Sequence, residues 1–168
     1  MSANTSPAIL CFSKSGHTRR AADTLAQRTV AEVIPIETDR YKVPLLWILR
    51  AIWDVGRSHL PPLTGGNVVT ANRPWIVVAC PIWADQPASP ARSVINALAS
   101  TATPVGLLTT SGGAGEPLKC VATCETVLGR RLAASLNIQN KIEDTPETDK
   151  RLDAFAHAMM TSASQGVV

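Results

Sequence analysis

Short apolar runs alternate with helical patterns along almost the whole of this chain of 168 residues. The run at residues 75–80 is nearly continuous in apolar side chains, which is typical of a parallel strand that is covered on both faces. Parallel strands need long crossover connections, and helices provide them on both faces of a sheet. The alternation therefore predicts an α/β fold of three layers, built on a doubly wound parallel sheet.

Five strands are expected, at residues 8–12, 32–36, 75–80, 105–109 and 136–139. Helical patterns are expected at residues 16–29, 89–98, 117–132 and from residue 145 onward. Pro35 favours an edge position for the second strand, because proline has no N–H group to donate to a neighbouring strand. The five-stranded form of such a sheet has the strand order 2-1-3-4-5, and its ligands bind at the carboxyl ends of strands one and three.

The composition excludes several classes of protein. The chain has 16 Lys and Arg against 13 Asp and Glu, a formal net charge of +3, and no basic run dense enough to indicate nucleic-acid binding. Its longest apolar run is too short for a membrane span, and its N-terminus lacks the pattern of a signal peptide. Its four cysteines lack the spacing of a disulfide framework. We therefore expect one cytoplasmic domain over residues 1–168, with reduced cysteines.

The turn after the first strand has the composition of a phosphate site. It consists of Ser13, Lys14, Ser15, Gly16, His17 and Thr18. A helix follows at once, so hydroxyls, backbone N–H groups and the positive end of the helix dipole would converge on one anion. The turn lacks the second glycine and the Gly-Lys-Ser/Thr ending of a Walker loop, and it is not a Gly-x-Gly-x-x-Gly fingerprint.

The loops after the third and fourth strands are suited to a flat ring. The first of them consists of Pro81, Ile82, Trp83, Ala84, Asp85, Gln86 and Pro87. Trp83 at its tip would either stack on such a ring or fold back to cap the sheet. The second loop contains Ser111, Gly112 and Gly113, where a ligand can approach main-chain N–H groups closely. An ordinary strand-to-helix turn that needs positive φ angles would have a similar sequence.

Together, Ser-Lys-Ser-Gly-His-Thr, Pro-Ile-Trp-Ala-Asp-Gln-Pro and Thr-Ser-Gly-Gly-Ala-Gly resemble the three FMN-contacting loops of the flavodoxin-like family. The resemblance extends from Ala8 to the last helix, and it implies FMN as the cofactor. It implies a phosphate held by Ser13, Ser15, Thr18 and the amides around Gly16, and a ring framed by Trp83 with Pro81, Ile82 and Ala84. It further implies that Ser111, Gly112 and Gly113 meet the polar edge of the ring. Lys14, His17 and Asp85 complete the predicted cofactor site. Many relatives have a glycine after the loop aromatic, where this chain has Ala84 and Asp85.

The resemblance implies electron transfer through FMN. The protein would act as a shuttle to a redox partner protein or as an NAD(P)H-dependent reductase of a small acceptor such as a quinone. Two alternatives stay open. One is a binding or scaffold domain that kept the fold without a flavin. The other is an enzyme like the low-molecular-weight phosphatases and arsenate reductases, which need a nucleophilic cysteine with an arginine six positions later. Here Cys11 is followed at that distance by His17.

Residues 40–63, between strands two and three, form a predicted helical insertion. Its apolar residues at helical spacing are Leu45, Ile48, Leu49, Ile52 and Trp53. The opposite face would carry Arg50, Asp54 and Arg57. We expect the apolar stripe to pack on the sheet as extra core. A further hypothesis is that the insertion, with its aromatic residues Tyr41, Trp47 and Trp53, covers the flavin site or forms the contact of a homodimer.

Overall fold

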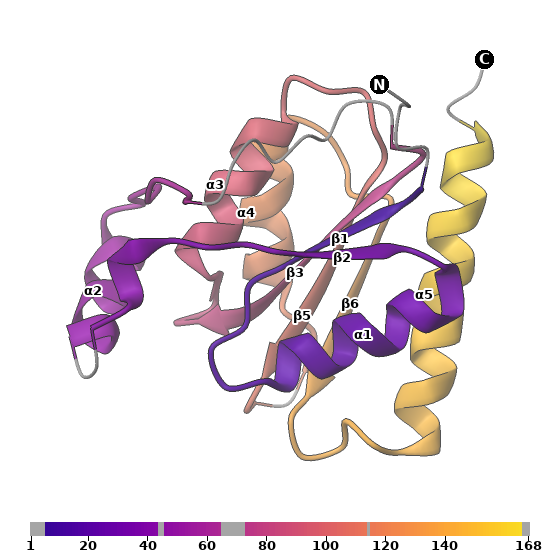
Figure 1. The fold of residues 1–168 in the computed structure, drawn as a ribbon, viewed down its shortest axis with the longest axis horizontal. Coiled ribbons are helices and arrows are strands. Elements are labelled where there is room, and N and C mark those ends of the chain that lie inside the picture. Colours follow the sequence, from indigo (N-terminus) through magenta and orange to yellow (C-terminus); the bar gives the residue numbers. More distant parts are fainter. Residues whose placement is uncertain (1–5, 44–45, 65–72, 114, 166–168) are drawn as a thin grey trace.

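The computed structural model describes residues 6–43, 46–64, 73–113 and 115–165 (Figure 1). Its parallel strands are β1 (Ala8–Cys11), β2 (Glu32–Pro35), β3 (Ile76–Trp83), β5 (Val105–Ser111) and β6 (Ala134–Gln139). They lie in the order β2-β1-β3-β5-β6, and the two-residue strand β4 (Gln86–Pro87) pairs antiparallel with the end of β3. With β4 set aside, this is the predicted order 2-1-3-4-5. The edge position of the proline-containing strand β2 is confirmed as well.

Helices cover both faces of the sheet, which confirms the predicted three layers (Figure 1). The helices α1 (His17–Thr29) and α5 (Pro146–Gln165) lie on one face, and α3 (Ser89–Leu98) and α4 (Leu118–Leu128) lie on the other. Helix α4 ends before the predicted residue 132, because Gly129 takes a φ of 74° and its N–H donates to the Glu125 carbonyl oxygen. Among the described helices, none combines the length and the apolar character that crossing a membrane requires.

The hydrophobic core has two halves, one on each side of the sheet. On one side the buried residues of α1 and α5 pack against alternate residues of β1 and β3, such as Ile9 and Val77. On the other side α3 and α4 pack against the remaining residues, such as Leu10 and Val78. Both strands are thus buried on both faces, as the continuous apolar run at residues 75–80 predicts. This packing fixes the edge of the sheet at which the three candidate loops emerge.

The insertion between β2 and β3 contains a 3-10 turn η1 (Asp39–Tyr41) and the helix α2 (Leu46–Gly56). The predicted burial of its apolar stripe is wrong, because Ile48, Leu49, Ile52 and Trp53 are exposed. Leu45 lies outside the described residues. The residues of α2 that are buried are Ala51 and Asp54. The helix therefore presents to the interior a face that the sequence pattern assigns to solvent.

Candidate functional site

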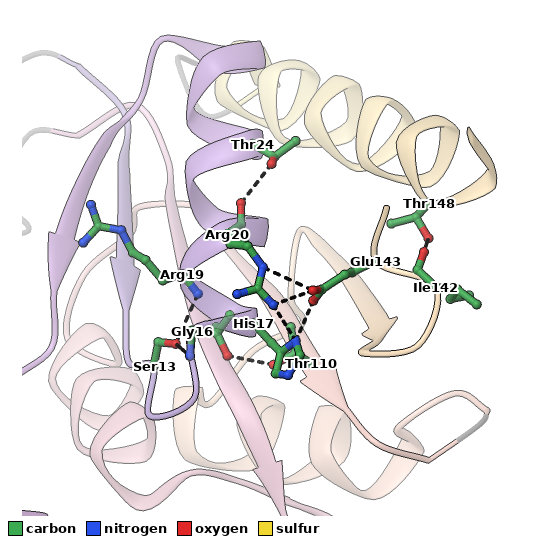
Figure 2. Close-up of polar contacts among 11 residues, drawn as sticks. Ser13, Gly16, His17, Arg19, Arg20, Thr24, Thr110, Ile142, Glu143 and Thr148 are labelled. Atoms are coloured by element: carbon green, nitrogen blue, oxygen red, sulfur yellow. Dashed lines mark hydrogen bonds and ion pairs between the residues drawn. The ribbon is translucent and has the colours of Figure 1, made fainter. Parts of the chain in front are cut away.

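The phosphate-like turn at residues 13–18 joins β1 to α1 at the carboxyl edge of the sheet. Gly16 has a φ of 92°, a conformation that favours glycine, and it precedes the first residue of α1. The Ser13 hydroxyl accepts hydrogen bonds from the backbone N–H groups of Gly16, at 3.2 Å, and Arg19, at 3.3 Å (Figure 2). Ser15 is exposed at the outside of the turn. The turn thus brings the hydroxyls of Ser13 and Ser15 and several backbone N–H groups close to the N-terminus of α1.

Thr18 ties this turn to the strand β5. Its hydroxyl oxygen lies 2.7 Å from that of Thr110, and both side chains are buried. Thr110 directly precedes the loop that contains Ser111, Gly112 and Gly113. The first and third candidate loops are therefore held together by a hydrogen bond between side chains 92 residues apart.

His17 and Arg20, in the first turn of α1, both contact Glu143 from the segment between β6 and α5 (Figure 2). His17 Nδ1 lies 2.7 Å from Glu143 Oε2, and the Arg20 guanidinium forms an ion pair with the same carboxylate. Burial alone would raise the pKa of Glu143, but the hydrogen bonds from His17 and Arg20 outweigh it and lower the pKa below its usual value. Sequence reasoning found neither Arg20 nor Glu143, because no local pattern marks this pairing.

The insertion contacts the phosphate-like turn and the predicted ring loop. Lys14 Nζ donates to the Tyr41 carbonyl oxygen at 2.8 Å and lies 5.5 Å from the centre of the Trp47 ring. Trp83 packs edge-on against Tyr41, with ring centres 5.3 Å apart, and against Phe12 at 5.5 Å. Trp83 therefore folds onto an aromatic cluster at the end of β1, and its contact with a flavin ring stays a prediction.

The loop after β3 is a tight hairpin, in which Trp83 pairs with Gln86. Its two tip residues, Ala84 and Asp85, have φ angles of 46° and 62°. Two successive residues with positive φ are typical of the turn that matches the twist of a two-residue hairpin. These positions usually hold glycine or asparagine, so Ala84 and Asp85 carry no hairpin signal that sequence reasoning could use. The Asp85 side chain is 76% exposed and lies 3.8 Å from Lys119 Nζ, so it points to solvent.

The loop after β5 is organised by Asn137, a buried residue of β6. The Asn137 amide donates to the Ser111 hydroxyl at 3.1 Å and to the Gly115 carbonyl oxygen at 3.2 Å. Its side-chain oxygen accepts a hydrogen bond from the Thr109 hydroxyl at 3.1 Å. Ser111 in turn donates to the Gly113 carbonyl oxygen at 3.1 Å. Sequence reasoning missed Asn137, although an asparagine within a predicted strand is a signal that could have found it.

Replacing Asn137 with alanine is expected to lower the free energy of unfolding by about 1–3 kcal/mol, because it removes three hydrogen bonds of a buried side-chain amide, those with Thr109, Ser111 and Gly115. Urea unfolding measures the difference. Asn96→Ala, at an exposed position of α3, provides the control and should change the stability by less than about 0.5 kcal/mol. Equal stabilities of the two variants would show that Asn137 does not hold the loop.

A pocket of about 490 Å³ lies between the β3–β4 hairpin and the loop after β5. It is lined by Ile82, Ala84, Asp85, Ser111, Gly112, Gly113, Gly115, Glu116, Pro117, Leu118, Lys119 and Asn137. Six of these residues belong to the predicted cofactor site. Pro81, Trp83 and the turn at residues 13–18 lie outside this lining. The volume falls within the range of small-molecule sites, and a Cβ added at Gly112 or Gly113 would meet no atom within 4 Å.

Cys11 does not have the properties of a nucleophile. It is a buried residue of β1, and burial raises the pKa of its thiol to about 12. A nucleophilic cysteine has a lowered pKa and access to substrate. This environment disfavours the phosphatase-like alternative.

No family model and no curated protein matches the sequence. Among solved structures, the chain is similar to a flavoprotein in complex with FMN from Lactobacillus acidophilus, with a TM-score of 0.68, 18% identity and coverage of 87% of this chain and 97% of that chain. It is also similar to oxidised flavodoxin 2 from Bacillus cereus, with a TM-score of 0.59, 17% identity and coverage of 93% and 98%. Rubredoxin oxygen:oxidoreductase from Desulfovibrio gigas matches with a TM-score of 0.63 and 14% identity, over 98% of this chain and 37% of that one. The chain has the flavodoxin-like fold that its three loops predict.

Proposed function

We propose that this protein binds FMN at the carboxyl edge of its sheet and transfers electrons through it. The main support is the pocket that the β3–β4 hairpin shares with the loop after β5, beside the N-terminus of α1. A doubly wound sheet of this order binds its ligands at this edge. The solved structure of a similar fold in complex with FMN supports the choice of this cofactor.

The residues of this edge fit the chemistry of FMN. The wall formed by Gly112 and Gly113 carries no side chain, so main-chain N–H groups are within reach of a polar ring edge. The phosphate would lie at the turn of residues 13–18, where the N-terminus of α1 favours an anion. The Thr18 hydroxyl is buried and shares a hydrogen bond with Thr110. The better phosphate ligands are therefore the exposed Ser15, the Ser13 hydroxyl, which accepts two hydrogen bonds and can still donate its own proton, and the backbone N–H groups of the turn.

Bound FMN would supply one- and two-electron redox chemistry, while the protein binds it, orients it and shields part of it from water. At the rim of the pocket, Asp85 and Lys119 are both 76% exposed and carry opposite charges 3.8 Å apart, so their fields largely cancel in solvent. The electrons would pass either to a partner protein or to a small acceptor such as a quinone.

The first experiment is a titration of the purified protein with FMN, followed by its visible spectrum and by tryptophan fluorescence. We expect a dissociation constant at or below the micromolar range, with quenched fluorescence because Trp47 and Trp83 lie near the site. Riboflavin, which lacks the phosphate, should bind about 10 to 100 times more weakly if the turn supplies one or two charge-assisted hydrogen bonds. No binding at micromolar FMN would instead support a scaffold domain. Equal affinities for the two flavins would exclude the turn as the phosphate site.

A further inference from the structure

The helix α2 carries an exposed apolar surface, which we call the α2 face. It consists of Leu46, Ile48, Leu49, Ile52 and Trp53, each between 45% and 65% exposed. Val43 and Leu60, outside the helix, are exposed as well. Figure 1 shows α2 at the left margin of the molecule, away from α1 and α5. A contiguous apolar surface of this kind on a folded domain indicates an interaction site.

The orientation of α2 is set by a buried polar network on its inner side. The Asp54 carboxylate is fully buried and accepts hydrogen bonds from Arg40 Nε and Nη2, each at 2.5 Å, and from the Tyr41 hydroxyl at 2.5 Å. Arg50 donates to the Arg40 carbonyl oxygen at 2.7 Å. Turning the apolar face inward would break these bonds and leave charged groups without partners. The exposure of the α2 face is therefore a consequence of strong local interactions.

The excess charge around the α2 face is positive. Of the four Lys and Arg residues at 40–63, Arg40 forms an ion pair with the buried Asp54 and Lys42 with Asp39, so the excess is that of Arg50 and Arg57. The Arg57 guanidinium is exposed and lies 3.9 Å from the centre of the Trp53 ring. A shallow pocket of about 260 Å³ on this surface is lined by both arginine and apolar side chains: Arg40, Leu46, Leu49, Arg50 and Trp53.

We propose that the α2 face docks on the surface of a lipid bilayer that contains anionic lipids. A helix with exposed leucine, isoleucine and tryptophan next to arginine lies in the plane of such an interface, with its apolar side chains among the acyl chains. The arginines would meet the lipid phosphates. A second copy of this chain fits less well. In a symmetric contact the α2 helices of the two protomers would face each other, and the two Arg57 side chains would come close together. The acidic residue of α2, Asp54, is buried, so it is not at the surface to neutralise them.

The docking surface adjoins the candidate flavin site. Trp47 on α2 lies 6.2 Å from Trp83, measured between ring centres. On the basis of the proposed function, docking would bring the flavin close to an electron acceptor dissolved in the membrane. The docking itself requires no flavin, so it can be tested on the protein with or without FMN.

The test is sedimentation of the full chain with vesicles, combined with tryptophan fluorescence. Vesicles of phosphatidylcholine with one third phosphatidylglycerol should bind the protein and shift the emission to shorter wavelength, because the half-exposed Trp53 enters an apolar environment. Pure phosphatidylcholine vesicles should bind about tenfold more weakly or not at all. The double variant Leu49→Gln, Ile52→Gln should lose at least about tenfold in binding. Arg57→Gln should lose about fivefold on anionic vesicles alone.

Matched controls are Met160→Gln and Arg131→Gln, which remove an exposed apolar side chain and an exposed charge far from α2. Both should bind like the wild type, and thermal unfolding monitored by circular dichroism should show that all variants are folded. Absence of binding to anionic vesicles overturns the proposal. Binding that survives the Leu49 and Ile52 substitutions also overturns it, because the apolar face would then have no role. A concentration-dependent dimer that these substitutions dissociate, without vesicle binding, would assign the face to a second copy.

Discussion

Replacing Asp54 with asparagine is expected to lower the free energy of unfolding by about 2–4 kcal/mol. The carboxylate is 0% exposed and accepts three hydrogen bonds from Arg40 and Tyr41. An asparagine has a single side-chain oxygen, and its NH₂ group would face donors instead of acceptors. The loss is smaller than for a fully buried ion pair, because the Arg40 side chain is 31% exposed and can reach water. Thermal and urea unfolding measure the difference.

Asp153→Asn provides the control for this substitution. Asp153 also accepts a hydrogen bond from an arginine, Arg28, at 2.7 Å, but its side chain is 65% exposed. A surface pair of this kind contributes between 0 and about 1 kcal/mol. Similar losses in the two variants would mean that the Asp54 network does not anchor α2, and the account of its exposed apolar face would fail with it.

The effect of Asp54 on stability should depend on pH. Burial alone would raise the pKa of Asp54, but hydrogen bonds from Arg40 and Tyr41 lower it below the ordinary value. A carboxyl group whose pKa is lower in the folded state stabilises the fold above its unfolded pKa, and this contribution is lost as the pH falls through the folded value. The difference between wild type and Asp54→Asn should therefore be complete at neutral pH and shrink below about pH 4. A difference that stays constant down to pH 2 would show that the charge is not involved.

The sheet could be predicted from the sequence because its signals are local. A continuous apolar run marks β3 as a central strand, and a proline marks β2 as an edge strand. The right-handed crossovers of alternating strands and helices indicate a doubly wound sheet, and the order 2-1-3-4-5 is that of its five-stranded form. Because parallel strands end at the same edge, the sequence predicts that the three candidate loops lie together, and the hydrogen bond between Thr18 and Thr110 places two of them in contact.

The orientation of α2 could not be predicted in this way. An amphipathic pattern defines two faces of a helix, but contacts with the rest of the chain determine which face is buried. In α2 the buried face is set by the hydrogen bonds of Asp54 with Arg40 and Tyr41, which lie 14 and 13 residues before it. The pairing of His17 with Glu143 spans 126 residues, so no window along the sequence contains both groups. Asn137 differs from these groups, because an asparagine inside a predicted strand is a local signal, and sequence reasoning overlooked it.

Replacing Gly112 with leucine is expected to weaken FMN binding by at least about a hundredfold, which corresponds to about 2.8 kcal/mol. Gly112 lines the 490 Å³ pocket, and a Cβ added there would meet no protein atom within 4 Å. A leucine side chain at this position adds bulk to the lining of the pocket and is expected to compete with the ring for space. The φ angle of Gly112 lies outside the left-handed region, so the fold should tolerate the substitution. An FMN titration followed by visible absorption measures the loss.

The control is Ala154→Leu, which adds a comparable volume at an exposed position of α5 and should leave the affinity for FMN unchanged. Thermal unfolding should show that both variants are as stable as the wild type within about 1 kcal/mol. If Gly112→Leu binds FMN as tightly as the wild type, the ring does not occupy this pocket. The aromatic cluster of Phe12, Tyr41 and Trp83 would then be the next place to test, because it also lies beside the phosphate-like turn. If affinity falls a hundredfold while stability is kept, the ring lies between the hairpin and the glycine loop, and the comparison of FMN with riboflavin then tests whether the phosphate-like turn holds the other end of the cofactor.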